Sequence, residues 1–303
     1  MPAAPLTYPL GPPSVSGTTV TVDVLLNRPG AITRDIARLA DQKFFAKMVF
    51  SDAGGIEGGA LLFELPPSTT TDLYMANAIQ EVAPGEEFPI NAPNRGVPVI
   101  GKPRKLGTKW EVTKEANKRN NTLTISNAMT QTANTIALTL DAMAVSVLAT
   151  AITANSRTLA GQSWATAAAV TNLNASGTNM PTSDLLSARK AIELELRGQN
   201  LDSALIHPNQ ELSLGQIATR MGTSIDALLG SVGIKNWFAS PRITAGTATL
   251  YEAGQVGGWA TEFPLVGVIY WDEKTESWWY QWSVSPLMFV DNPYAVLQLT
   301  GIA

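Results

Sequence analysis

The sequence predicts an α+β fold in which a long helix and long strands reach well beyond a compact part. Three observations support this prediction. A helical period runs without interruption through residues 124–155. A polar stretch rich in proline and glycine, residues 81–96, lies between two strand-like runs. From residue 240 onward the sequence consists mainly of strand-like runs.

The composition is that of a folded chain with little surface charge. Of its 303 residues 45% are apolar and only 15% are charged, whereas about 25% is usual in soluble proteins. We therefore expect partners to cover much of the exterior. The formal net charge of −4 argues against tight nucleic-acid binding, which needs lysine and arginine to displace counterions. It permits proximity to DNA without specific contacts.

Composition also excludes several kinds of site. The chain has no cysteine, which removes disulfides, thiolate metal sites and cysteine nucleophiles. Its first residues have no signal-peptide pattern. The apolar run 133–154 is long enough to span a membrane, but Asp141 lies at its middle, where a charge costs at least about 2.5–3.5 kcal/mol. We therefore expect no membrane segment.

The N-terminal part is expected to form an arm followed by a short helix. Residues 1–30 combine proline, glycine, threonine and valine without a helical period, which is typical of an extended arm. Such termini are ordered only where something holds them, and a neighbouring subunit is the expected holder. A helical spacing of apolar residues follows within residues 32–50. Residues 58–65 then have the composition of a strand.

Residues 74–113 are predicted to form a long β-hairpin with residues 81–96 at its tip. Each limb of roughly 18 residues would extend about 60 Å, whereas a compact chain of this length has a radius of gyration of about 19 Å. An isolated two-stranded hairpin is also only marginally stable in water. Either the limbs are shorter than this, or the arm rests on another molecule.

The predicted hairpin carries acidic side chains on its outgoing limb and tip and mainly basic ones on its returning limb. These residues are Glu81, Glu86, Glu87, Arg95, Lys102, Arg104, Lys105 and Lys109. The charges alone favour cross-strand pairs on a solvated hairpin, at about 0.2–1 kcal/mol per pair. The alternative is a two-sided arm that lies across complementary neighbouring subunits. In that case these residues make inter-subunit contacts.

Residues 124–155 are predicted to form one long helix laid along a sheet. Its apolar seam steps by four and three residues, through Met129, Ala133, Ile136, Leu140, Met143 and Val147. About 28 residues at 1.5 Å per residue span roughly 42 Å. A coiled coil is the alternative, but the run contains too few clean heptads to favour it.

The next part of the chain predicts a block of helices and strands after a long connection at residues 155–182. Residues 182–199 have the pattern of an amphipathic helix, capped by Thr182 or Ser183 and ended by Gly198. Its inward positions are Leu185, Leu186, Ala188, Ile192 and Leu196. A buried strand ends at Pro208, and two short helices follow. The later strand-like runs are 240–246, 248–254, 265–273, 277–286 and 287–303.

No catalytic constellation is evident. The one histidine, His207, lacks the three or four ligands of a metal site and is interpreted as a strand-end residue with a local hydrogen bond. The glycine-rich residues 54–59 lack the lysine of a phosphate-binding loop. We therefore expect no enzyme activity, no cofactor and no metal.

The aromatic run WWYQW, residues 278–282, has two interpretations. Alternation along a strand puts Trp278, Tyr280 and Trp282 on one face and Trp279 on the other. A covered sheet or a subunit interface is the favoured use of so much aromatic area. The alternative is a carbohydrate-binding or hydrolytic site. Its candidate acids are Glu252, Glu262, Asp272 and Glu273.

The order of these pieces resembles that of one family. The stretches ITRDIARLADQKFFAKMVF, GGALLFE, AIQEVAPGEEFPI, GTKWEVTKEA and MFVDNPYAVLQLTGI together span nearly the whole chain. Their order and spacing resemble the major capsid proteins of tailed bacteriophages, which have the Hong Kong 97 capsid fold. The resemblance is greatest to versions from phages of actinobacteria.

The resemblance implies a layout with two domains and two extensions. It assigns residues 1–50 to an N-terminal arm and short helix, 51–73 to a peripheral-domain strand, and 74–113 to an extended loop. Residues 114–182 would form the peripheral domain with its spine helix. Residues 183–270 would form an axial domain, and residues 271–303 would be C-terminal strands that return to the peripheral domain. The axial domain would gather around five-fold and six-fold axes.

The resemblance also implies a structural function. Pentamers and hexamers would assemble in the bacterial cytoplasm into an icosahedral virion shell around double-stranded DNA. A portal protein is the expected partner, with a separate scaffolding or decoration protein, since the arm begins at Met1 and leaves no room for an N-terminal scaffolding domain. The alternative within the same fold is the encapsulin-like shell of a cellular nanocompartment.

Some relatives join their subunits by an isopeptide bond between a lysine of the extended loop and an asparagine of the peripheral domain. The resemblance makes Lys102 or Lys105 the donor and Asn292 the acceptor. The favoured interpretation is plainer: the lysines form ordinary ion pairs, and Asn292 is a turn residue before Pro293.

Overall fold

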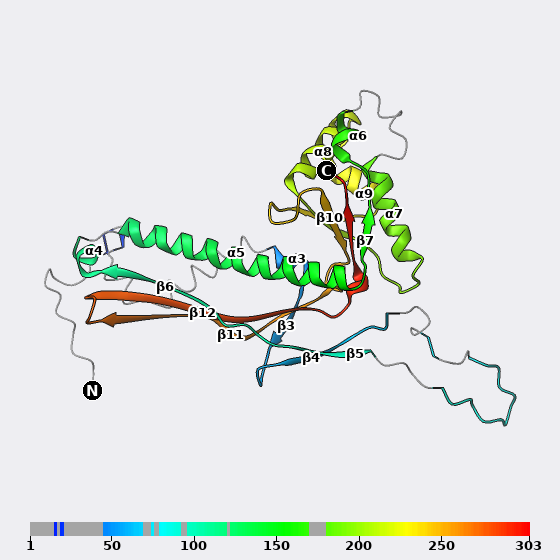
Figure 1. Ribbon diagram of the computed structural model, residues 1–303, viewed down its shortest axis with the longest axis horizontal. Coiled ribbons are helices and arrows are strands. Elements are labelled where there is room, and N and C mark those ends of the chain that lie inside the picture. Colours follow the sequence, from blue (N-terminus) through cyan, green and yellow to red (C-terminus); the bar gives the residue numbers. More distant parts are fainter. Residues whose placement is uncertain are drawn as a thin grey trace.

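The computed structural model describes residues 15–16, 19–20, 45–68, 74–75, 79–91, 96–119, 122–169 and 180–303. Figure 1 shows a long helix over a long sheet, a compact domain at one end of this layer, and a segment that projects away from both. The expected arm lies outside the described residues, apart from two paired strands, β1 (Val15–Ser16) and β2 (Thr19–Val20). Most of the helix expected within residues 32–50 also lies outside them, and its described end contains α3 (Ala46–Val49).

The long helix α5 covers one face of a four-stranded sheet. It spans Thr122–Ala154, close to the predicted bounds. The sheet has the order β3-β11-β12-β6, formed by β3 (Ser51–Gly55), β11 (Gly257–Asp272), β12 (Ser277–Val290) and β6 (Leu106–Thr113). β12 is antiparallel to both β11 and β6, whereas β3 runs parallel to β11. The prediction of a single helix laid along a sheet is confirmed.

Small side chains on α5 bring it close to the large side chains of this sheet. Ala133 and Ala137 are fully buried in the cluster that contains Tyr280 and Trp282. Ile136, a predicted seam residue, is partly buried beside them. The buried line of α5 is therefore centred on alanines here, and the aromatic residues of the sheet supply most of the volume of this core.

A five-stranded sheet forms the centre of the compact domain. Its order is β7-β13-β10-β8-β9, formed by β7 (Thr158–Ala160), β13 (Val296–Thr300), β10 (Thr247–Tyr251), β8 (Ser203–Ile206) and β9 (Asn236–Ala239). The helices beside it are α6 (Trp164–Ala169), α7 (Pro181–Glu193), α8 (Pro208–Arg220) and α9 (Ile225–Ser231). One cluster of buried apolar side chains joins these elements. The predicted buried strand before Pro208 and the two helices after it are confirmed.

Two predictions of secondary structure in this domain are wrong, because both were based on local composition alone. Residues 240–246 form turns, and the strand beside them is β9 instead. Residues 155–182, expected to be a connection, contain β7 and α6. Both elements are short, and they are held by the sheet and the core rather than by a strong pattern of their own.

Helix α7 also differs from its predicted bounds. Met180 precedes it, Pro181 occupies its first turn, and it ends at Glu193, so neither Thr182 nor Ser183 caps it. Proline suits this position because the first turn needs no N–H partner. Past the end of the helix the apolar period has no structural meaning. Leu196, expected to face the core, is therefore 74% exposed.

The projecting segment leaves and returns through a short two-stranded ribbon. β4 (Leu61–Leu65) pairs antiparallel with β5 (Val97–Gly101), and beyond them the chain projects away from the rest of the molecule (Figure 1). The strand predicted within residues 58–65 is confirmed. The bounds predicted for the hairpin, residues 74–113, are wrong because β6 pairs with β12. The paired limbs are therefore shorter than predicted.

Two further segments lie elsewhere than the implied layout placed them. Residues 257–270, expected in the axial domain, belong to β11, which β12 holds in the long sheet. β13, expected to return to the helix-and-sheet layer, lies between β7 and β10 in the compact sheet. In both cases the position is decided by pairing with distant strands, which local sequence does not reveal.

Candidate interaction surfaces

The described part of the chain holds no arrangement typical of a metal site. His207 precedes α8, and its Nδ1 accepts a hydrogen bond from the backbone N–H of Asn209 at 3.1 Å. The local role predicted for this histidine is confirmed. Among the described residues, no three His, Cys, Asp or Glu side chains are grouped so that they could hold a metal ion.

One face of the aromatic run at residues 278–282, formed by Trp278, Tyr280 and Trp282, belongs to the core. Trp110 of β6 stacks on Tyr280 at 4.1 Å and on Trp282 at 5.6 Å between ring centroids. Side chains of α5 close this face of the sheet. Tyr280 is fully buried, and burial raises the pKa of its hydroxyl. The prediction of a covered sheet is confirmed, because Tyr280 and Trp282 leave no ring face open to a sugar.

Two of the candidate acids of a hydrolytic site lie far apart on one strand. Glu262 and Asp272 are separated by ten positions on β11, about 33 Å at 3.3 Å per residue. Paired carboxylates of glycoside hydrolases lie about 5–9.5 Å apart. Glu252 already accepts a hydrogen bond from the N–H of Asn200 at 3.1 Å. The geometry therefore gives the carbohydrate hypothesis no support.

The far part of the projecting segment exposes large apolar side chains. Ile79 is 99% exposed, Phe88 79% and Ile90 89%. Between them the chain turns at Gly85, whose φ of 95° suits glycine because other residues rarely adopt it. Exposed apolar side chains gathered on one segment are typical of a surface that another molecule covers.

The charged side chains of this segment are not paired across strands in the described part of the chain. Glu81, Glu86 and Glu87 are exposed, and none of the ion pairs among the described residues joins them to Lys102, Arg104, Lys105 or Lys109. The ammonium group of Lys109 instead lies 4.5 Å from the ring centroid of Trp279. Arg95 lies outside the described residues. The cross-strand pairs that the charges alone favoured are thus missing here, because β5 pairs with β4 rather than with the acidic limb.

A groove of about 660 Å³ lies between the ribbon, α5 and β12. Its apolar lining includes Phe63 and Phe289, whose ring centroids are 4.9 Å apart. Helix α5 contributes small side chains, among them Ala142. Lys102 and Arg104 also line the groove and are exposed. The groove therefore combines apolar walls with two positive charges.

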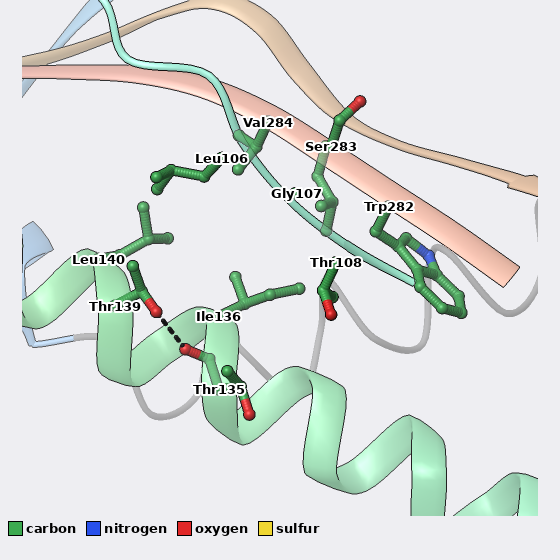
Figure 2. A pocket seen from close by; sticks show the side chains of 11 residues that line it. Leu106, Gly107, Thr108, Thr135, Ile136, Thr139, Leu140, Trp282, Ser283 and Val284 are labelled. Atoms are coloured by element: carbon green, nitrogen blue, oxygen red, sulfur yellow. Dashed lines mark hydrogen bonds between the residues drawn. The ribbon is translucent and has the colours of Figure 1, made fainter. Parts of the chain in front are cut away.

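A smaller hollow of about 120 Å³ separates α5 from β6 and β12 (Figure 2). Ile136, Leu140 and Val284 are among its apolar lining residues. Thr139 lines it too, but its hydroxyl donates a hydrogen bond to the carbonyl of Thr135 at 2.8 Å. The hollow is therefore largely apolar, and its lining includes no Asp, Glu, His, Lys or Arg side chain that could activate the hydroxyl groups of its threonines and Ser283.

Asn292, the candidate crosslink acceptor, lies in a different hollow from the candidate lysines. Glu64 and Asp291 line this hollow of about 390 Å³, and burial raises the pKa of the Asp291 carboxyl. Neither Lys102 nor Lys105 lines it. Among the described contacts of one chain, no hydrogen bond joins either lysine to Asn292.

Two buried charged residues have roles that sequence reasoning missed. Asp141 of α5 is fully buried and pairs with Arg242. Arg197 has a side chain that is only 3% exposed and that lies against Tyr294. A charge inside an apolar run was the available signal for Asp141, whereas no local pattern marks Arg197.

By length and composition alone Asn127–Ala154 qualifies as a membrane-spanning helix, but its one charge is paired inside the protein.

Comparisons with known proteins give one family and one fold. A family model described as phage capsid protein matches residues 96–297, more than half of the chain. No curated protein matches the sequence. Among solved structures, a virus-like particle from Pyrococcus furiosus has a TM-score of 0.60 at 12% identity and covers 89% of this chain and 98% of its own. The structure of Microbacterium phage Oxtober96 has a TM-score of 0.59 at 9% identity and covers 85% of this chain and 90% of its own. The capsid of cyanophage P-SCSP1u has a TM-score of 0.58 at 14% identity and covers 85% of this chain and 87% of its own.

Proposed function

Because the chain belongs to the phage capsid protein family and has the Hong Kong 97 capsid fold, we propose that it is the major structural subunit of a phage head. Pentamers and hexamers of the chain form an icosahedral shell that encloses double-stranded DNA, and the protein is not an enzyme. The family match favours this function over an encapsulin-like compartment. The observation that carries the proposal is the projecting segment, whose large apolar side chains are exposed in the described part of the chain.

In this proposal the structural bodies take the roles of capsid domains, with bounds revised from the implied layout. Helix α5 and its four-stranded sheet form the peripheral domain. The compact domain with its five-stranded sheet is the axial domain and gathers at the symmetry axes. The segment between β4 and β5 is the extended loop. The portal protein and a separate scaffolding or decoration protein remain expected partners.

The extended loop is proposed to rest on a neighbouring subunit. Its tip combines exposed Phe88 with the acidic Glu86 and Glu87. The groove beside α5 combines apolar walls with Lys102 and Arg104. Tip and groove are complementary in both polarity and charge, and such complementarity fixes partner and register. We assign the tip of one subunit to the groove of the next.

Electron microscopy of the purified protein tests the main proposal. Closed particles that contain DNA when isolated from infected cells are expected. Protein that remains a small monodisperse species under all assembly conditions would refute the capsid function. Particles filled with a protein cargo instead of DNA would favour the nanocompartment.

A charge swap tests the contact between tip and groove. Glu86→Lys with Glu87→Lys, and separately Lys102→Glu with Arg104→Glu, are expected to impair assembly, most strongly at low salt, because exposed charges are screened at high ionic strength. All four changes in one chain should restore assembly. Glu273→Lys with Lys274→Glu, in the turn after β11, is the matched control. If both double variants assemble as well as wild type, the tip does not bind in this groove.

A further inference from the structure

Arg197 is a buried arginine in the loop that follows α7. Only 3% of its side chain is exposed, although charged side chains are rarely buried unless they are paired. Its guanidinium carbon lies 3.6 Å from the ring centroid of Tyr294. Its Nε is 3.8 Å from a carboxylate oxygen of Glu195. The side chain is thus held between an aromatic ring and a carboxylate.

The outer nitrogens of Arg197 bind the chain where the projecting segment begins. One donates to the carbonyl of Pro67 and the other to the carbonyl of Ser68, each at 3.0 Å. These carbonyls lie two and three residues after the end of β4. A planar guanidinium that bridges two successive carbonyls fixes the direction of that backbone as well as its position.

A second arginine anchors the same contacts to the compact domain. Arg157 has a side chain that is 7% exposed, and it pairs with Glu195. It also donates to the carbonyls of Tyr294 at 3.2 Å and Val296 at 3.3 Å. Glu195 therefore lies between two arginines. We call Arg157, Glu195, Arg197 and Tyr294 the arginine clamp.

The backbone on either side of Arg197 is left-handed, which is unfavourable at Leu196 but ordinary for glycine at Gly198. Leu196 has a φ of 54° and Gly198 a φ of 76°. Left-handed backbone is costly for leucine, and the Leu196 side chain is too exposed for packing to hold it there. Such strain persists only where surrounding contacts enforce it. The described contacts at this point are those of Arg197 together with the hydrogen bond that the N–H of Leu196 donates to the carbonyl of Glu193 at 3.2 Å.

We propose that Arg197 is a positioning residue of assembly, which sets the direction in which the projecting segment leaves the subunit and thereby the curvature of the particle. The proposal rests on the capsid function. A segment of this length can work as a lever, because fifteen residues of extended chain would span up to about 50 Å. A rotation of about 10° at its root would move such a tip by about 9 Å, enough to change the neighbour that it meets.

Distance measurements on the unassembled subunit test the lever directly. The chain has no cysteine, so Ala83→Cys in the tip and Gln216→Cys on α8 take one spin label each. We expect a narrow distance distribution in the labelled wild type and a broad one with Arg197→Lys, because an ammonium group cannot bridge two carbonyls and stack on Tyr294 at once. Tyr294→Phe keeps the ring and should keep the distribution narrow.

Particle size measured by electron microscopy provides the second readout. Arg197→Lys is expected to give particles of mixed size or open sheets, whereas Arg189→Ala is the control. Arg189 pairs with Glu193 on α7 and touches no part of the projecting segment in the contacts described. Wild-type distances and wild-type particles for Arg197→Lys would overturn the proposal. If wild type forms no particles, the capsid function fails, and the distance measurement alone decides the role of the clamp.

Discussion

Arg242 forms an ion pair with Asp141 inside the molecule, although the two residues are far apart in the sequence. Asp141 is fully buried at the middle of α5, and it also accepts a hydrogen bond from the N–H of Phe45 at 3.2 Å. Arg242 donates in turn to the carbonyl of Ala137 at 3.2 Å. The pair therefore joins the long helix, the turn before β10 and the start of α3 at one point.

Breaking this pair is expected to destabilise the subunit more than replacing it. Asp141→Asn leaves the Arg242 charge without its partner. Because about a quarter of the Arg242 side chain is exposed, we expect the free energy of unfolding to fall by about 3 kcal/mol, the lower end of the range for a fully buried pair. Asp141→Leu with Arg242→Met should cost only about 1–2 kcal/mol, mainly because the N–H of Phe45 loses its acceptor. Urea unfolding of the unassembled subunit measures both values.

An exposed pair provides the control for this comparison. Lys114 and Glu276 lie 2.7 Å apart at the surface, where such pairs contribute little. Glu276→Gln should leave the unfolding midpoint almost unchanged. Equal losses for Asp141→Asn and for the double replacement would show that the pair is not a coupled unit.

The sequence predicted α5 well because its signal is local. A helical period over many residues predicts a helix regardless of what packs on it. The alternation at residues 278–282 is also a local signal, and it predicted which aromatic rings face α5. The partner of Asp141 was beyond prediction, because nothing near either residue indicates that Arg242 lies opposite. The same holds for Arg197, whose two acceptors are backbone carbonyls and therefore have no sequence signal.

Strand partners were the main source of error. The composition of β6 suits the returning limb of a hairpin as well as it suits a strand of the long sheet. Trp110 of β6 stacks on Tyr280 and Trp282 of β12, and this packing favours the position of β6 in the long sheet. Packing between strands outweighs the preference of either strand alone. The candidate contact residues at the tip remain a prediction, because the partners proposed for them belong to a second subunit.

A methyl group at Gly96 is expected to open the root of the projecting segment. A Cβ at this position would lie 2.4 Å from the carbonyl oxygen of Leu65, and a backbone atom in the paired strand cannot move aside alone. We expect Gly96→Ala to keep the fold, to speed amide hydrogen exchange in β4 and β5, and to impair particle formation. Hydrogen-exchange mass spectrometry and electron microscopy measure these effects.

Gly230 provides the control for the substitution at Gly96. It lies in α9, and a Cβ there would meet no atom within 4 Å. Gly230→Ala should be neutral or stabilise the subunit by up to about 1 kcal/mol, since alanine favours the helix over glycine. Unchanged exchange in β4 and β5 for Gly96→Ala would contradict the expectation of a clash.

Assembled particles are expected to contain no isopeptide crosslink through Asn292. The side-chain oxygen of Asn292 accepts a hydrogen bond from the N–H of Tyr294 at 3.3 Å, a turn role that needs no second subunit. Boiled, denatured particles should therefore run as a single monomer band on a gel. A ladder of bands that disappears with Asn292→Asp, and with Lys102→Arg or Lys105→Arg, would reverse this interpretation.

Stability is expected to fall at high pH through Tyr251. Burial raises the pKa of this hydroxyl to about 12, whereas a tyrosine in the unfolded chain titrates near 10. Below pH 10 both states keep the proton, so the contribution is fully present. Between pH 10 and 12 the unfolded chain loses a proton that the folded chain keeps, and unfolding becomes more favourable by up to about 2.7 kcal/mol.

Unfolding of wild type and Tyr251→Phe at pH 9 and pH 12 isolates this effect from the titration of other groups. As the pH rises from 9 to 12, the free energy of unfolding of wild type should fall by roughly 2–3 kcal/mol more than that of Tyr251→Phe. Tyr280→Phe should shift in the same direction, because burial also raises the pKa of that hydroxyl. Tyr270→Phe, on the exposed part of β11, is the control. A difference between wild type and Tyr251→Phe that stays constant with pH would mean that Tyr251 is open to solvent in the folded subunit.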